Sequence, residues 1–530
     1  MGLLLENTYI ADVVVLVLTA VYLLYWYGTS TFDYWKKKGV PEIKKKVPFF
    51  GSDMDAVLLR KQMSFVIQDL YNELDGHKYG GMFSMRRPTL LVRDPELIKQ
   101  IMVKDFSSFT DNGQITSEKN DPMFAYNIFA MKGDKWKYAR SKMAPAFATG
   151  KIRSTFPLIL EICEDLKRHI NKKIESNSNC YEFEAHDFTK NYTTDVVGSC
   201  AFGIKCNSLS EPNNQFREMG KEILSPASFR RQVEISVLFA FPKIAELIGI
   251  KFIAKYTEDF FRDLILKAFA YREKHPEFKR NDFINLLMQL KKLGEVELDE
   301  HDKKEINISA VANEKGKIEF TDTVLTAQAV GFFIDGFETS SLALAFTLHE
   351  LAMNPSIQDK LREELNNSFE SNGGKIDYEN IRGCSYLDNI LHETLRMYSP
   401  AGALARECTK RYTIPDSNVQ LEVGDLITIP VYGLHHDPKY FPNPEVFDPD
   451  RFTEEAKKTR PAFAYLPFGE GPRQCIGFRF AQAQVKAAIA TIVLNFRLEQ
   501  SEKTEHPVVF NEKNFLLHAK NGLHLKISPL

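Results

Sequence analysis

The sequence has no excess of charge of either sign, and it has no paired cysteine motif. Lysine and arginine number 68 against 70 aspartate and glutamate residues, a formal net charge of −2. The composition therefore gives no support for nucleic acid as a partner and leaves only local basic patches open. The seven cysteines form no C-x-x-C pair and no Cys/His ladder, which argues against a structural zinc site. Unpaired thiols fit a reducing compartment best.

The chain also lacks internal repeats and any polar or Gly/Ser-rich linker that would divide it. With 530 residues, 44% of them hydrophobic, we expect a sizeable core in one large domain. Helical periodicity dominates, as over 156–174. Alternating segments predict strands in a hairpin around Arg86–Pro88, over 419–438, and in a hairpin around Asn521–Gly522. The predicted fold class is mainly α with small β-sheets (α+β).

One long apolar run stands near the N-terminus, YIADVVVLVLTAVYLLYWY at 9–27. Its length is close to the roughly 20 residues that span a bilayer as a helix. A cleaved signal peptide is the alternative, but no lysine or arginine precedes the run, and aromatics stand where a small-residue cleavage site is needed. We therefore predict an uncleaved single-pass anchor.

The charges that flank this run are unequal. Glu6 precedes it, whereas lysine clusters at 36–38 and 44–46 follow it, which by the positive-inside tendency places the body of the protein in the cytosol. Prolines and a glycine between and after the clusters predict a stiff, kinked tether. The predicted organisation is an anchor over 1–28, a basic tether over 29–51 and a single large domain over 52–530.

The stretch LPFGEGPRQCIGFRF at 466–480 surrounds one cysteine with three glycines. Glycine permits turns and close backbone approach that side chains would block. Arg473 supplies a cation two residues before Cys475. Backbone N–H groups in such a loop can point at a thiolate sulfur and lower its basicity. A buried, inert cysteine beside an ordinary turn is the plain alternative.

The spacing Phe468-x-x-Gly471-x-Arg473-x-Cys475-x-Gly477 resembles the heme-binding signature of the cytochrome P-450 family. The resemblance implies that Cys475, as a thiolate, is the axial ligand of the iron of heme b and favours O–O cleavage. It also implies cofactor contacts for Phe468, Arg473 and Gly477. The domain over 52–530 would then be a single heme-thiolate domain.

Other motifs of that family occur in the family's order. In ETLR, Glu393 and Arg396 are three residues apart and share a helix face, where they can form a charge pair. In FDPDRF, Arg451 matches the family residue that completes a buried triad with this pair. Exposed, solvated pairs are the common alternative for such spacing.

Two further motifs match family residues that contact the heme propionates. WKYAR places Trp136 and Arg140 at i and i+4 on one helix face, and LARECTK supplies Arg406, a less secure match. Without the resemblance, a solvated arginine beside a core tryptophan would be favoured.

A long helix is predicted from Thr321 to Met353, begun by a Thr/Asp cap. Within it, DGFETS resembles the family's oxygen-binding stretch, so that Glu338 and Thr339 match the acid–alcohol pair that organises water and delivers protons. A Thr/Ser kink in a core helix is the alternative. Asp335 stands where many relatives carry alanine, and it would be an expensive unpaired charge near a heme. It either turns to a partner or alters the proton supply.

The resemblance runs from the anchor to the C-terminal strands. It implies an endoplasmic reticulum monooxygenase that inserts one oxygen atom of O2 into a lipophilic substrate, xenobiotic or endogenous, in the manner of the insect detoxification branch. The implied partners are a membrane flavoprotein reductase supplying NADPH electrons, cytochrome b5 and the bilayer. An oxygen-independent heme-thiolate isomerase or dehydratase and a noncatalytic heme sensor stay open. Thr339 and Glu338 count against the isomerase.

Overall fold

The computed structural model describes residues 2–114, 116–177, 179–224, 228–278, 280–296, 316–370 and 373–530. The chain divides into two compact units, Met1–Gly113 with Gly402–Leu434, and Gln114–Ala401 with His435–Leu530. This division does not test the predicted domain boundaries, which stay a prediction.

The first unit contains the N-terminal helix and a mixed sheet. Its α-helices and strands are α1 (Gly2–Thr29), α2 (Tyr34–Lys37), α3 (Met54–Val57), α4 (Met63–Glu73), β1 (Tyr79–Ser84), β2 (Arg87–Val92), α5 (Pro95–Lys99), β4 (Leu404–Glu407), β5 (Tyr412–Thr413), β6 (Gln420–Leu421) and β7 (Leu426–Ile429), with α20 (Val431–His435) at its end.

The sheet of the first unit has the strand order β1-β2-β7-β4. β1 and β2 pair antiparallel from Tyr79 opposite Val92 to Ser84 opposite Arg87, which confirms the predicted hairpin. Trp35 packs fully buried against this sheet, and its indole N–H donates to the carbonyl of Met82 at 3.0 Å. Residues 29–51, predicted as a tether, thus also contribute to this core.

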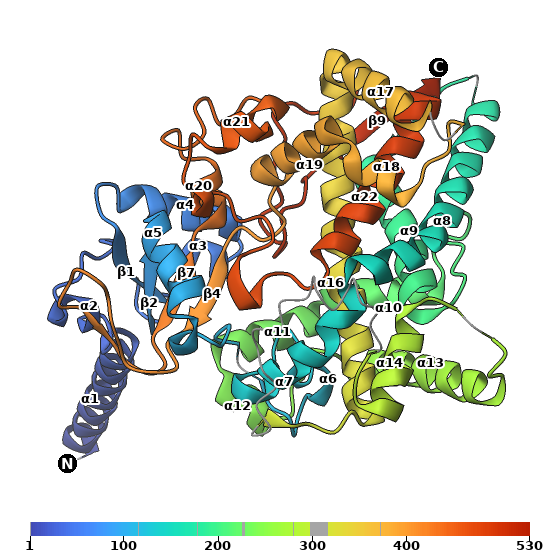
Figure 1. The fold of residues 1–530 in the computed structure, drawn as a ribbon. Helices are drawn as coiled ribbons and strands as arrows, with labels where there is room; N and C mark the ends of the chain where they lie inside the picture. Colours follow the sequence, from blue (N-terminus) through green and yellow to red (C-terminus); the bar gives the residue numbers. More distant parts are fainter. Residues whose placement is uncertain are drawn as a thin grey trace. The chain divides into compact units, whose positions relative to one another are not determined.

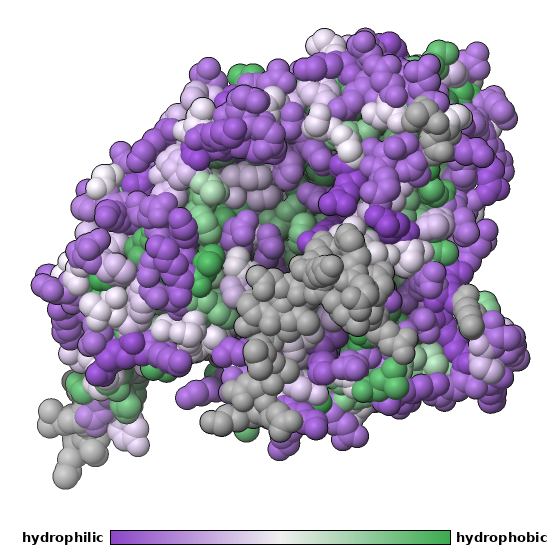
Figure 2. All heavy atoms as spheres, viewed as in Figure 1, coloured by the Kyte–Doolittle hydropathy of each residue, from purple (hydrophilic) through white to green (hydrophobic). Residues whose placement is uncertain are grey.

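Helix α1 is long and apolar enough to cross a membrane. Over Tyr9–Thr29 its mean hydropathy is 2.0, and its side chains are exposed. Figure 2 shows them as a projecting apolar rod at the lower left of the view. Apolar side chains gain free energy when they are removed from water, so a helix that exposes them along its whole length is unfavourable in water and suits a bilayer. The predicted anchor segment is therefore a helix of the right length.

The second unit is mostly helical. Its α-helices and strands are α6 (Pro122–Ala125), α7 (Gly133–Met143), α8 (Thr149–Glu175), β3 (Tyr181–Glu184), α9 (Ala185–Val197), α10 (Gln215–Leu224), α11 (Phe229–Ala240), α12 (Pro242–Leu247), α13 (Lys255–Lys274), α14 (Phe283–Leu293), α16 (Asp322–Met353), α17 (Pro355–Glu370), α18 (Tyr378–Gly383), α19 (Ser385–Met397), α21 (Glu454–Lys457), α22 (Phe478–Asn495), β8 (Phe496–Gln500) and β9 (His524–Pro529).

Helix α16 is the centre of the second unit. It packs against α6, α9, α13, α19 and α22 (Figure 1), and most of its side chains are buried. A helix that is apolar all round is expected in the core of a large protein. Its start is as predicted, because Thr321 caps it by accepting a hydrogen bond from the backbone N–H of Val324 at 3.4 Å.

The small sheet of the second unit corrects one prediction. β9 pairs antiparallel with β3 and with β8, while Ala519 lies opposite Phe510. The prediction of a hairpin around Asn521–Gly522 is therefore wrong, because the segments on its two sides pair with other segments and not with each other. Gly522 does take a positive φ of 79°. The turn signal is local, whereas strand pairing is decided by packing against distant segments.

The predicted triad is confirmed and buried. Arg396 contacts both carboxylate oxygens of Glu393, at 2.7 Å and 2.8 Å, and both side chains are fully buried. Nε of Arg451 lies 3.3 Å from Oε1 of Glu393. Since the charges satisfy one another, the triad fixes the connection between α19 and the segment that carries Arg451.

Breaking this triad from one side should strongly destabilise the protein. The change Arg396→Met leaves the Glu393 carboxylate buried with less compensation, so we expect a loss of about 3–5 kcal/mol in the free energy of unfolding. Urea unfolding followed by far-UV circular dichroism measures it. The matched control is Lys457→Met, in the exposed pair with Glu454, which should leave the midpoint unchanged. Equal midpoints for both variants would contradict a structural role for the triad.

Candidate active site

The loop before α22 positions the Cys475 thiol. Gly469 and Gly471 have φ of 67° and 74°, a region that favours glycine. The backbone N–H of Cys475 donates to the carbonyl of Phe468 at 2.9 Å and closes the loop. The backbone N–H of Gly477 donates to the Cys475 thiol. A donor aimed at sulfur is the arrangement that stabilises a bound thiolate.

The Cys475 thiol is accessible and yet surrounded by protein. Its side chain is exposed, but desolvation raises its pKa to about 11, and the charge of Asp335 adds to the rise. The Gly477 N–H and the positive charge of Arg140 act in the opposite direction. These two properties together are expected of a group on the wall of an internal binding site. A metal ion would take the place of the thiol proton.

Arg473 lies against Trp136, and its predicted contact with the cofactor stays a prediction. Its guanidinium lies over the ring of Trp136, 4.0 Å from the ring centroid, and the positive charge that acts on the Cys475 thiol is that of Arg140. A cation stacked on an aromatic face is stabilised there. Arg473 also donates hydrogen bonds, at 3.3, 3.3 and 2.7 Å, to the carbonyl oxygens of Ile128, Phe129 and Met131. It therefore ties the loop to the segment before α7.

Half-buried Arg140 and buried Arg406 lack a carboxylate partner among the described residues. In the second unit, Arg140 donates only to the carbonyl of Gln474, at 2.8 Å, and burial lowers its pKa to about 10. In the first unit, Arg406 on β4 donates to the side chain of Asn112 at 3.1 Å, its Nε has no partner, and burial again lowers its pKa to about 10. Buried cations need anions. The contact of either arginine with a heme carboxylate stays a prediction.

The remaining predicted cofactor contacts lie around the Cys475 loop. Trp136 is buried on α7. The half-buried ring of Phe468 pairs with that of Phe478 at 6.1 Å between centroids. Gly477 directly precedes α22. Their contact with a cofactor stays a prediction.

Asp335 and Thr339 share one face of α16. The Thr339 hydroxyl donates to the backbone carbonyl of Asp335 at 2.5 Å, as threonines in helices often do. The Asp335 carboxyl makes no hydrogen bond or ion pair within the described part of the chain, and desolvation raises its pKa to about 7. Its charge acts on Cys475. The unpaired carboxyl has therefore not turned to a partner; instead its pKa rises.

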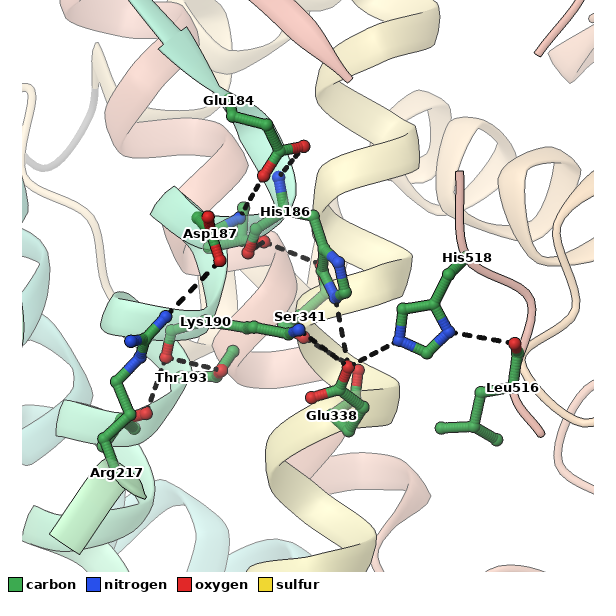
Figure 3. A network of polar contacts seen from close by, with 12 residues as sticks. Glu184, His186, Asp187, Lys190, Thr193, Arg217, Glu338, Ser341, Leu516 and His518 are labelled. Atoms are coloured by element: carbon green, nitrogen blue, oxygen red, sulfur yellow. Dashed lines mark hydrogen bonds and ion pairs between the residues drawn. The ribbon is translucent and has the colours of Figure 1, made fainter. Parts of the chain in front are cut away.

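Glu338 points elsewhere (Figure 3). Its Oε1 lies 2.7 Å from Nε2 of His518, 3.1 Å from Nζ of Lys190 and 3.3 Å from Nε2 of His186. Burial would raise the pKa of Glu338, but these donors hold it well below its usual range. Successive residues of a helix do not face each other. The structure thus separates Glu338 from Thr339, with which the sequence pairs it.

The sequence analysis missed the basic partners of Glu338. His186 and Lys190 are four residues apart on α9, and this spacing on one helix face was a signal that could have been found. His518 lies 180 residues from Glu338 in the sequence and carries no local signal.

Comparisons with known proteins agree with this geometry. The model of the family described as Cytochrome P450 matches residues 41–525. Cytochrome P450 9e2 of Blattella germanica is 39% identical over 518 residues, which cover 95% of each chain. Probable cytochrome P450 6a13 of Drosophila melanogaster is 36% identical over 97% of this chain and 98% of its own. Cytochrome P450 6B2 of Helicoverpa armigera is 35% identical over 96% of each chain.

Replacing the thiol should abolish thiolate ligation. We expect the reduced carbon monoxide complex of the purified protein to show a red-shifted Soret band, and Cys475→Ser to lose it, because a neutral hydroxyl is a poor electron donor to iron. The control is Cys180→Ser, a half-buried free cysteine, which should keep the band. Retention of the band in Cys475→Ser would exclude this ligand.

Proposed function

This chain belongs to the cytochrome P450 family, and on that premise we propose the roles that its own residues play. It is a heme-thiolate monooxygenase that acts on lipophilic substrates and takes NADPH electrons from a reductase. Heme b, when bound, supplies the activation of O2 and the transfer of one oxygen atom. The observation that carries the residue assignments is the Cys475 thiol, accessible in a glycine-shaped loop with a backbone N–H aimed at it.

We infer that Cys475 is the metal ligand and that Arg140 and Arg406 pair with the heme carboxylates. The lack of a carboxylate partner for either guanidinium among the described residues supports this pairing. Trp136 would pack beside the cofactor, held by the stacked Arg473. Gly477, through its N–H, would tune the sulfur.

Thr339, Asp335 and Glu338 would manage protons. The Thr339 hydroxyl can both accept and donate a hydrogen bond and so can hold a water. Asp335, with a pKa near neutrality, can hold or release a proton at the same wall. Glu338 would receive protons from its basic partners. Its side chain would then turn away from these partners and pass the protons on. These roles divide one task among three side chains of α16.

The substrate class is proposed as xenobiotic or lipid-like, with a further electron contribution from cytochrome b5. We propose location in the endoplasmic reticulum membrane with the catalytic domain in the cytosol. The apolar helix α1 and the lysine clusters after it support this topology. A second apolar surface on and after α12 suits contact with a bilayer, because Leu247 and Ile248 are 86% and 62% exposed.

Removing the Thr339 hydroxyl should uncouple electron use from product formation. In Thr339→Ala we expect heme binding and NADPH consumption to be kept. Product per NADPH should fall roughly 10-fold or more, the range for loss of one proton-transfer group, and hydrogen peroxide should rise in its place. The measurement is product and peroxide per NADPH. The double change with Asp335→Ala should uncouple further than either single change. Wild-type coupling in both would contradict the assignment.

The topology predicts that protease added to intact microsomes digests the body of the protein. The sequon at Asn191, on α9, should carry no glycan, because it would remain on the cytosolic side. Detergent-permeabilised microsomes are the control and should give the same digestion. If the body were protected in intact microsomes and digested only after permeabilisation, it would lie in the lumen, and the predicted topology would be wrong.

A further inference from the structure

The partners of Glu338 form a closed ionic cluster, the His-Lys-Glu cluster, of His186, Lys190, Glu338 and His518. All three basic side chains converge on a single oxygen, Oε1 of Glu338, from three directions (Figure 3). The side-chain exposures are only 12%, 19%, 5% and 10%. Three basic side chains therefore surround a carboxylate whose single negative charge one cation would neutralise.

The His518 ring shares a proton with Glu338. Its Nδ1 lies 2.9 Å from the carbonyl of Leu516, and since a carbonyl only accepts, Nδ1 carries hydrogen. Its Nε2 lies 2.7 Å from Oε1 of Glu338. Two acceptors cannot bond at that distance, so a proton lies between them, either on an imidazolium or on a neutral carboxyl. The contact is therefore a hydrogen bond that carries a proton between the two side chains.

A metal ion does not fit this cluster. The ligand atoms of His186, Glu338 and His518 lie within 4.8 Å of one another, a spacing that metals use. However, Nζ of Lys190 already lies 3.1 Å from the shared oxygen, and an ammonium so close repels a second cation. Protons are the cations that this site can exchange.

The cluster borders a cavity of about 350 Å³. The two histidine rings lie 4.9 Å apart between centroids, and both line this cavity. Asp187, whose side chain is 72% exposed, and exposed Asn521 belong to the same wall. The cavity therefore reaches the surface and is large and polar enough for water. Other lining residues are Glu184, Leu342, Phe346, Asn514, Ala519, Gly522 and Leu523.

We propose that His186 and His518 are the proton entry of this enzyme, loading Glu338 from the water of this cavity. The step rests on the proposed function of Glu338. An imidazolium gives its Nε2 proton to Oε1 of Glu338, and the neutral imidazole takes a proton from cavity water. Protonation cancels the charge that holds Glu338 to Lys190, which frees the carboxyl to turn toward the side of α16 that carries Thr339. Both histidines are positioning residues.

Glutamine substitutions separate this role from a structural one. Glutamine at 518 can still donate a hydrogen bond to Glu338, and glutamine at 186 keeps a polar side chain beside it, but neither can carry a proton. The holoenzyme, its reductase and the alkoxycoumarin that wild type oxidises best would be used. We expect His518→Gln and His186→Gln to raise peroxide per NADPH roughly threefold or more and to increase the solvent isotope effect on product formation. The carbon monoxide spectrum and the substrate-induced spectral shift should not change.

The matched control is His524→Gln. This histidine of β9 contacts the carbonyl of Asn521 rather than Glu338. It should behave as wild type. If both cluster variants keep wild-type coupling and isotope effect while Glu338→Gln uncouples, the proton entry is refuted and the proposed role of Glu338 stands. If Glu338→Gln also keeps coupling, the proposed role of Glu338 itself fails.

The pH profile gives a third readout. Desolvation lowers the pKa of His186 below the usual histidine value, and an imidazolium donor is lost as pH rises through its pKa, so wild-type product per NADPH should fall as pH rises through that lowered pKa. The double variant His186→Gln with His518→Gln should lose this dependence. An unchanged profile would overturn the proposal. The charged groups facing the pair from the elements packed around it are Glu184, Asp187, Lys190, Glu338 and, through Asp187, Arg217.

Discussion

The pitch of α16 is the constraint on which the polar architecture depends. With 3.6 residues per turn, one step along a helix turns a side chain by about 100°. Asp335 and Thr339, four residues apart, share a face, whereas the side chain of Glu338 is turned by about 100° from that of Thr339 and points to its basic partners. The same helix is buried against neighbours on most sides, so each polar face must be satisfied separately. One face meets the wall that carries Cys475, and the other meets the His-Lys-Glu cluster.

Charge is treated differently in two buried regions. In the triad, Glu393 accepts hydrogen bonds from Arg396 and forms an ion pair with Arg451, so its charge is compensated. Around Cys475, by contrast, Arg140 lacks a counterion among the described residues, and Asp335 lacks a partner. Burial without pairing moves pKa values toward the neutral form. A fold that satisfies its structural charges and leaves its site charges unmatched has reserved the latter for a bound group.

The sequence predicted those features that have a fixed local spacing. The Cys475 loop, the cap at Thr321, the start of the first hairpin and the triad all depend on residues close together or on motifs of known order. The sequence analysis did not predict that Arg473 stacks on the ring of Trp136, a contact between residues far apart in the sequence. It failed for the strands around Gly522, whose partners lie far away in the chain. It missed His518 for the same reason, since nothing near residue 518 indicates Glu338.

The two carboxylates of α16 show what orientation alone can do. Desolvation raises the pKa of Asp335 toward 7, and three basic partners hold that of Glu338 well below its usual range. Two acids three residues apart would compete if they faced one another, because like charges cannot both ionise at close range. Because Glu338 points to its basic partners and Asp335 does not, Asp335 titrates near neutrality while Glu338 stays charged. Environments that push two pKa values apart assign the roles of proton donor and proton acceptor. The division of labour on this helix therefore follows from direction as much as from residue type.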